Sequence, residues 1–181
     1  MTPKNIPHSF TALGCALACC LLAACSGSTG AASADTAPAT RPAGSAQLLQ
    51  QVRGAGEVGD ELDVQPLRDP RVEDLRAEAT AAEERGDYAG AARALAKAAE
   101  ITPDDPDLLQ WQAEMALVSR DWATADVLAA RSWERGPKLG GLCRRNWTTR
   151  RLAAEARNDT AAAAQAQQQV AACKVAPPVR L

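Results

Sequence analysis

The pattern of apolar and polar positions changes at Asp69. From there to residue 174 the chain is rich in alanine, leucine and charged residues, and its composition and apolar spacing predict successive α-helices. Before this point only residues 46–52 show helical spacing, and Gly54, Gly56 and Gly59 are expected to end that short helix. Its apolar positions are Leu48, Leu49 and Val52. Residues 46–68 are therefore expected to form a short helix and an irregular lead-in, and for 61–67 the pattern does not separate a loop from an extended segment.

Turn signals recur at a fixed distance along the helical region. Gly86-Asp87-Tyr88 is matched 34 residues later by Arg120-Asp121-Trp122. Further pairs keep the same offset: Ala79 and Ala113, Ala91 and Ala125, Pro103 and Pro137. Such a period is typical of a repeat protein in which each unit is one supersecondary motif.

Capping residues divide each unit into two helices. Asp69-Pro70 and Asp105-Pro106 suit helix starts, because the carboxylate accepts from free amides and proline lacks a donor that would otherwise be unpaired. Asp87 and Asp121 are expected to cap the second helices, and Pro103 and Pro137 to end them. Gly136 suits a left-handed C-terminal cap. Each unit is predicted to be a helical hairpin.

A third, degenerate unit follows, with Asn158-Asp159-Thr160 at its turn. It is offset by 38 residues from the second unit, so a few residues are inserted. Cys143 and Cys173 each lie 15 residues from Asn158, and folding the chain there brings the two thiols together. In an oxidising compartment this predicts a disulfide, which would close the open end of the stack; two buried free cysteines are the alternative.

These features together resemble the tetratricopeptide repeat family: the 34-residue period, the Gly-Asp-Tyr turn, the small Ala91 and Ala125, and the closing prolines. The resemblance implies an all-α fold, a short right-handed solenoid of about three hairpins. The expected units are 69–104, 105–139 and a degenerate 140–174, followed by a tail, 175–181. Ala79 and Ala113 depart from the family, which often has glycine there.

In that family the first helices of the repeats line a groove for extended peptides. By alignment the groove here would be mostly acidic with one apolar patch, and would be lined by Glu73, Arg76, Thr80, Glu83, Asp107, Gln110, Glu114, Leu117 and Val118. A basic or apolar segment of an envelope protein is the expected partner. A plain solvated helix face is the other interpretation.

A second candidate surface is a cationic run with one acidic residue, Glu134. Its members are Arg131, Arg135, Lys138, Arg144, Arg145, Arg150 and Arg151, with Trp147 among them. A basic edge with an aromatic side chain is suited to anionic glycans or lipopolysaccharide phosphates. Alternatively, the long arginine stems cover Trp133 and Trp147 while their charged heads stay in water.

The N-terminus carries an export signal. Lys4 precedes an uncharged run, 9–24, which is too short to span a bilayer. The uncharged run is followed by Cys25, and Leu22-Ala23-Ala24-Cys25 resembles the lipobox of bacterial lipoproteins. The resemblance implies removal of residues 1–24 and lipidation of Cys25 with diacylglycerol and a further acyl chain such as palmitate; a plain secretory leader is the alternative. Ser26, where an inner-membrane lipoprotein would have Asp, favours the outer membrane.

Residues 25–45 are rich in Ser, Ala, Thr and Pro and are expected to form a disordered tether. As a flexible coil, about 20 residues separate the anchor from the folded part by roughly 25 Å on average.

Composition narrows the possible chemistry. Without the leader the chain has no histidine, 19 basic residues and 22 acidic residues. Histidine-based catalytic pairs and histidine metal ligands are thus excluded. The chain has no positive net charge that would attract nucleic acid, and no cofactor is expected besides the lipid. Asp104, Asp105 and Asp107 would suit a glycosidase pair or a calcium site, but acidic residues there also cap the next helix.

We therefore expect a non-enzymatic, lipid-anchored scaffold on the periplasmic face of the outer membrane. It would serve a pilus, a secretion system or the cell-wall machinery, and self-association through an uncapped end of the stack stays open. Glycan binding through the basic edge is the alternative, and a carboxylate-based wall enzyme is a weaker one.

Overall fold

The computed structural model describes residues 44–58 and 67–174, all within one compact unit, Arg41–Leu181. This described part contains seven helices and no strand, which confirms the all-α prediction. The helices are α1 (Ser45–Gly56), α2 (Pro70–Glu84), α3 (Tyr88–Ile101), α4 (Pro106–Val118), α5 (Trp122–Arg135), α6 (Gly140–Ala156) and α7 (Thr160–Ala172). The expected leader, Cys25, nearly all of the tether and the tail lie outside the described residues.

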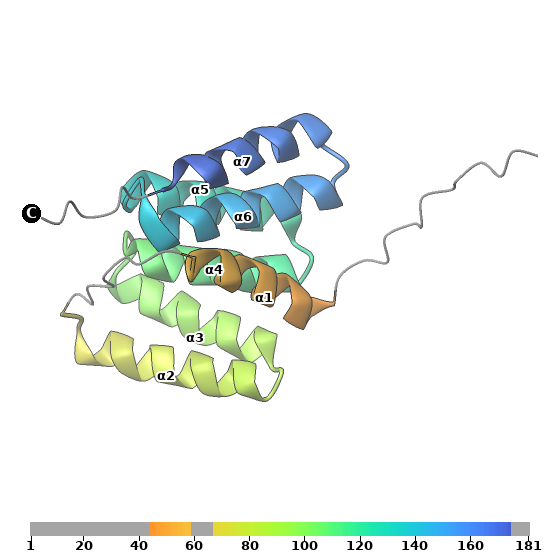
Figure 1. Cartoon of the computed structure of the whole chain (residues 1–181). Helices are drawn as coiled ribbons and strands as arrows, with labels where there is room; N and C mark the ends of the chain where they lie inside the picture. The colour runs from red at the N-terminus through yellow and green to blue at the C-terminus, as the bar shows by residue number, and fades with distance from the viewer. Residues whose placement is uncertain (1–43, 59–66, 175–181) are drawn as a thin grey trace, which may run out of the picture. The chain divides into compact units, whose positions relative to one another are not determined.

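Helices α2 to α7 form three hairpins that stack in chain order. α2 packs on α3, α4 on α5 and α6 on α7, while α3 contacts α4 and α5 contacts α6 to join one hairpin to the next (Figure 1). The expected succession of helical hairpins is confirmed. No helix in the described part of the chain is long and apolar enough to cross a membrane.

Aspartates cap the helices where the sequence indicates. The carboxylates of Asp69 and Asp105 accept from the first-turn amides of α2 and α4, and those of Asp87 and Asp121 from the first-turn amides of α3 and α5. Asp159 does the same for α7. These bonds satisfy amides that have no partner inside the helix, so nearby residues define the starts of these five helices, whereas α1 and α6 begin without a side-chain cap.

The residue before the second cap of each hairpin has the same unusual backbone. Gly86, Arg120 and Asn158 have φ values of 73°, 63° and 60°, in the left-handed region. Only glycine, and to a smaller degree asparagine, enters this region without a steric cost, so Arg120 is strained. The three turns are therefore structurally equivalent, although only the first carries glycine.

Two details differ from the sequence-based expectations. α1 runs beyond residue 52 and past Gly54, and it ends at Gly56. Gly136 is extended, with φ −97° and ψ −175°, not left-handed. A Cβ there would lie 3.1 Å from Pro106 Cβ and 2.9 Å from a carbonyl oxygen, so glycine is needed for close packing.

The insertion in the third unit is helical. α6 has 17 residues, whereas the equivalent α4 has 13, so the extra residues add a turn of helix. Gly140 and Gly141 are the first two residues of this longer helix.

Candidate functional site: the inner face and its resident helix

Helix α1 occupies the inner face of the stack. It contacts α4 and α6, the first helices of the second and third hairpins, although the next helix in the chain is α2 (Figure 1). Leu48, Leu49 and Val52 are buried in this interface, and Ser45 Oγ donates a hydrogen bond of 3.1 Å to the carbonyl oxygen of Val118. The groove that the tetratricopeptide resemblance implies is thus filled, over α4 and α6, by the chain itself.

Glu114 lies at the centre of the contact between α1, α4 and α6. Glu114 is 0 % exposed, and its carboxylate accepts a hydrogen bond from Arg53 Nε of α1 at 2.9 Å. Arg145 of α6 donates to the same carboxylate from Nε at 3.0 Å and from Nη2 at 2.6 Å. Gln110 Nε2 donates to it at 3.1 Å and to Thr149 Oγ1 at 2.9 Å. A buried carboxylate needs such partners, and here they come from three helices.

A second carboxylate extends this network to α2. Glu83 accepts from Arg53 Nη2, with an N–O distance of 2.9 Å, and from the indole N–H of Trp111. Burial by itself would lower the pKa of Arg53, but Glu114 and Glu83 outweigh it and raise the pKa above its ordinary value. Arg53 is therefore held as a cation between two carboxylates from different hairpins.

The C-terminal end of α1 is held by a buried arginine of α6. Arg144, 7 % exposed, donates from Nε to the carbonyl oxygen of Ala55 at 2.9 Å and from Nη2 to that of Gly56 at 3.2 Å. A cation at these carbonyls is favoured by the helix dipole. Gly141 makes the approach possible, because a Cβ there would lie 2.7 Å from the Gly56 oxygen.

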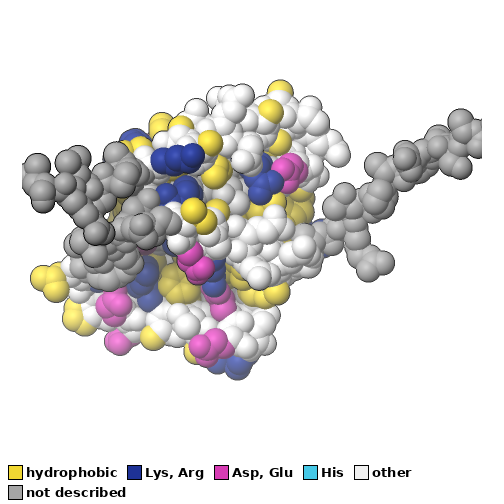
Figure 2. Space-filling model, in the orientation of Figure 1, with side chains coloured by type: hydrophobic (Ala, Val, Ile, Leu, Met, Phe, Trp, Pro, Cys, Tyr) yellow, Lys and Arg dark blue, Asp and Glu magenta, His cyan; other side chains and the backbone are white. Residues whose placement is uncertain are grey.

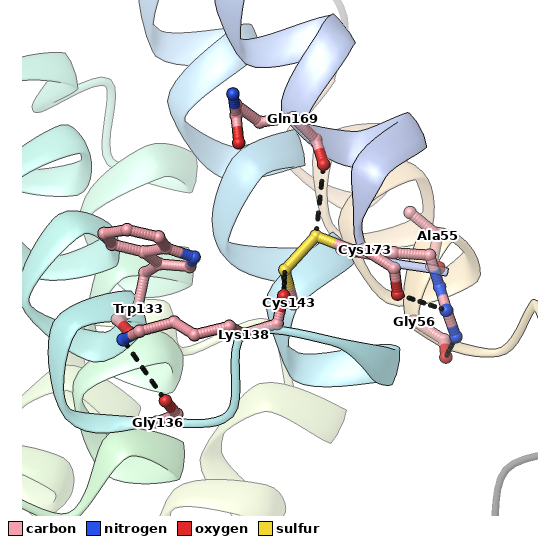
Figure 3. The surroundings of a disulfide bond; sticks show 9 residues. Ala55, Gly56, Trp133, Gly136, Lys138, Cys143, Gln169 and Cys173 are labelled. Atoms are coloured by element: carbon pink, nitrogen blue, oxygen red, sulfur yellow. Dashed lines mark hydrogen bonds between the residues drawn. A yellow bond between two sulfur atoms is a disulfide. The ribbon is translucent and has the colours of Figure 1, made fainter. Parts of the chain in front are cut away.

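Arg144 also connects α1 to a disulfide. The structure joins Cys143 of α6 to Cys173 at the end of α7, with the Cα atoms 5.7 Å apart. The carbonyl oxygen of Cys173 accepts from the Gly140 amide at 2.7 Å and from Arg144 Nη1 at 3.5 Å. Figure 3 shows the disulfide beside Ala55 and Gly56 of α1. The start of α6, the end of α7 and the end of α1 therefore meet at one point.

The expected open groove is wrong for its second-hairpin half. Gln110, Glu114, Leu117 and Val118 are all buried, the first two in the network beneath α1. The alignment found the inner face correctly. The amphipathic pattern of residues 46–52 showed that α1 buries one face, but not which surface it covers.

The first-hairpin half of the predicted groove is partly covered by Arg68, whose Nη2 donates to Asp107 at 2.7 Å. Arg68 Nε also lies 3.8 Å from Glu73, and Arg76 lies over the Trp111 ring at 5.2 Å. Thr80 of α2 is exposed. This end of the inner face is therefore only partly filled.

The predicted basic edge is not one surface. Arg144 and Arg145 turn inward to α1 and Glu114, as described above. The other arginines pair with carboxylates: Arg131 and Arg135 with Asp104, Arg150 with Asp126 of α5, and Arg151 with Glu155 of its own helix. Lys138 donates to backbone carbonyl oxygens, among them that of Glu134 at 2.9 Å. The hydrogen bond from Arg131 holds the pKa of Asp104 below its usual value. Most of these partners were missed because they lie far away in the sequence.

Part of the alternative interpretation of the basic run is seen directly. Trp147 is buried and packs edge-on against Trp133, with the ring centroids 5.5 Å apart. Arg150 lies over Trp147 at 4.4 Å and Lys138 over Trp133 at 4.3 Å. On the face seen in Figure 2, several basic side chains lie together at the upper left, and most of the acidic side chains lie in the lower half with basic side chains beside some of them.

The three aspartates near the start of α4, Asp104, Asp105 and Asp107, each make different contacts. Asp105 caps α4, Asp104 pairs with arginines of α5, and Asp107 binds Arg68. Within residues 44–58 and 67–174, no group of three or more His, Cys, Asp or Glu side chains is arranged to hold a metal ion.

These features define an all-α hairpin stack whose inner face holds a helix from its own N-terminal side. A solved structure of this class is similar: the globular C-terminal domain of P. aeruginosa LpoP. It shares 28% sequence identity with this chain at a TM-score of 0.54, and the match covers 58% of this chain and 99% of that one. No protein-family model and no curated protein matches the sequence.

Proposed function

We propose that this protein is an accessory protein of a bacterial envelope machine and that it acts by binding another protein. The observation that carries the proposal is the similarity to the LpoP domain, which this chain matches over 99% of that domain's length. Among the pilus, secretion and cell-wall machineries we put the cell-wall machinery first, because LpoP is the structural neighbour.

The proposal places the hairpin stack at the periplasmic face of the outer membrane, with Cys25 as the lipid anchor. The lipobox-like Leu22-Ala23-Ala24-Cys25 and the Ser/Pro-rich residues after it support this location. An anchored protein raises its local concentration near membrane-bound partners, so modest affinity suffices for function. A role without catalysis agrees with the lack of histidine in the chain after residue 24.

Site-specific photo-crosslinking in the native envelope tests the proposal. The reactive residue replaces Thr80, exposed on the inner side of α2, or Lys97, exposed on α3, as the matched control. We expect the Thr80 position to trap a protein of the cell-wall machinery, identified by mass spectrometry, and the Lys97 position to trap it weakly or not at all. Trapping of glycan or lipid only, equally from both positions, would contradict the proposal.

The anchor is tested separately by fractionation. Cys25→Ala should move the protein from the outer-membrane fraction to the soluble periplasmic fraction. If the variant stays with the outer membrane, the lipid is not what holds it there.

A further inference from the structure

The surface beneath α1 combines an apolar part, which packs on Leu48, Leu49 and Val52, with a polar network that is paired without α1. In this network Gln110 bonds both Thr149 and Glu114, and Arg145 binds Glu114. Burial of these polar groups costs free energy that a wholly apolar contact would not cost. Side chains already paired in this way can be exposed to water and covered again without losing those partners.

α1 has few features that would keep it helical on its own. Its N-cap residue, Gly44, gives no side-chain cap, and Gly54 lies inside the helix. Twelve residues with such a sequence do not hold a helix alone in water. α1 is thus helical because it is docked, and its only buried residues are Leu48, Leu49 and Val52.

The contacts of α1 specify what the inner face recognises. Two adjacent apolar side chains and a third one turn later pack down, and Arg53 next to the third binds two carboxylates, Glu83 and Glu114. Acidic groups that bind a cation favour a basic amphipathic helix and disfavour an anionic lipid surface. Such a helix lying in a groove is a common mode of recognition.

We propose that the inner face is an exchangeable binding site, and that the partner protein enters it with a basic amphipathic helix which displaces α1. The partner segment carries the pattern of Leu48-Leu49-Val52-Arg53: two adjacent apolar residues, a third one turn later and a following arginine. α1 is then a built-in competitor that weakens binding until the partner is abundant. That the displacing helix belongs to a partner protein rests on the proposed function. That α1 can be exchanged for another helix does not rest on it.

A labelled peptide of residues 44–58 is the probe for exchange, measured by fluorescence anisotropy on the full chain. Wild type should bind it weakly because its own α1 competes. Leu49→Asp with Val52→Asp in the chain should release the resident helix and tighten binding at least about tenfold, since affinity rises with the fraction of open sites. Val127→Asp, at an exposed position of α5, is the matched control and should behave as wild type.

Specificity and folding are checked with two further changes. The same peptide with Arg53→Glu should lose binding, because it brings a carboxylate to Glu83 and Glu114. Release of α1 should itself remove up to its 12 helical residues from the circular dichroism signal. If the doubly substituted chain loses more helix than that, Arg53→Glu in the chain replaces it, since this change weakens docking without altering the apolar contacts. Equal peptide binding by wild type and the released variant would overturn the inference.

The same variants separate the inference from the proposed function. At Thr80, the released variant should trap several-fold more of the envelope protein than wild type. Equal trapping, or crosslinks that join α1 to a second copy of this chain, would overturn displacement by a partner while leaving an accessory role intact. Peptide exchange without any trapped envelope protein would instead contradict the proposed function and, with it, the partner helix as the natural occupant.

Discussion

The two sides of α4 are packed by different means. Towards its neighbours in the stack the contacts are apolar and use small residues: Ala91, Leu95 and Ala98 of α3 and Ala125 and Ala129 of α5 are completely buried. Towards α1 the same helix offers Glu114 and Gln110, which bind arginines and a threonine. Apolar packing dominates between α4 and its neighbours α3 and α5, whereas the contact with α1 adds directional, charge-assisted hydrogen bonds to the burial of Leu48, Leu49 and Val52.

The apolar seam should be the most sensitive place in the molecule. Leu95→Ala removes a side chain that is completely buried in α3. The surrounding core can collapse only partly into the space that is left, so the free energy of unfolding should fall by about 4 kcal/mol. Urea denaturation measures this loss. Val127→Ala, at a position 66% exposed, is the control and should change stability by less than about 0.5 kcal/mol. If both substitutions lowered the free energy of unfolding equally, the apolar contacts between the hairpins would not be the main source of stability.

The disulfide should come next, because it closes α6 and α7 into one loop. Replacing Cys143 and Cys173 together by alanine should lower the free energy of unfolding by about 3 kcal/mol, as the unfolded chain regains the freedom of a loop whose ends lie 30 residues apart. Hydrogen exchange should localise the early opening to α7 and the end of α1, which share the Cys173 and Arg144 contacts. Protection lost first from α2 and α3 would contradict this placement.

The charged interface should give a smaller effect. Glu114→Gln keeps the shape but takes the negative charge from Arg53 and Arg145, whose side chains are 38% and 25% exposed and can partly turn to water. We expect a loss of about 2 kcal/mol, read from thermal unfolding. The matched control is Glu155→Gln, which breaks the Arg151 pair at a side chain 48% exposed and should cost less than about 1 kcal/mol. A similar loss in both would show that the inner network does not hold α1.

The smallest effect belongs to a helix cap. Hydrogen bonds from Thr124 lower the pKa of Asp121 below its ordinary value. The cap therefore stabilises the fold at pH above the unfolded pKa of Asp, and this contribution is lost as the pH falls through the lower folded pKa. Asp121→Asn keeps a capping oxygen but cannot titrate, so it should reduce the acid dependence of unfolding. A carboxyl titration of Asp121 by NMR at or above the value of a free Asp would contradict this prediction.

The sequence predicts those features of the fold that depend on residues close together in the chain. The caps at Asp69, Asp87, Asp105 and Asp121 depend on residues two or three positions away, so the positions of the hairpins follow from local sequence. The repeated left-handed turn depends equally on local geometry, even where Arg120 replaces glycine.

What the sequence did not predict depends on contacts between distant segments. Arg145 lies in a cationic run, but its partner, Glu114, is 31 residues away. Gly136 was expected to be a left-handed cap, whereas its lack of a side chain serves close packing against Pro106, and Gly141 serves close packing against Gly56 in the same way. A sequence pattern shows that a residue must be buried or paired, and only the fold shows which residues cover it or pair with it.

The position of α1 in the chain order also sets a length. While α1 is docked, the folded part begins at about Gly44, 19 residues along the chain from the proposed anchor at Cys25. Once α1 leaves the inner face, the chain from Ser45 to Asp69 joins the span between anchor and hairpins. Fully extended, these residues add about 80 Å of reach. A partner that displaced α1 would thus let the hairpins work much deeper in the periplasm than the docked form allows.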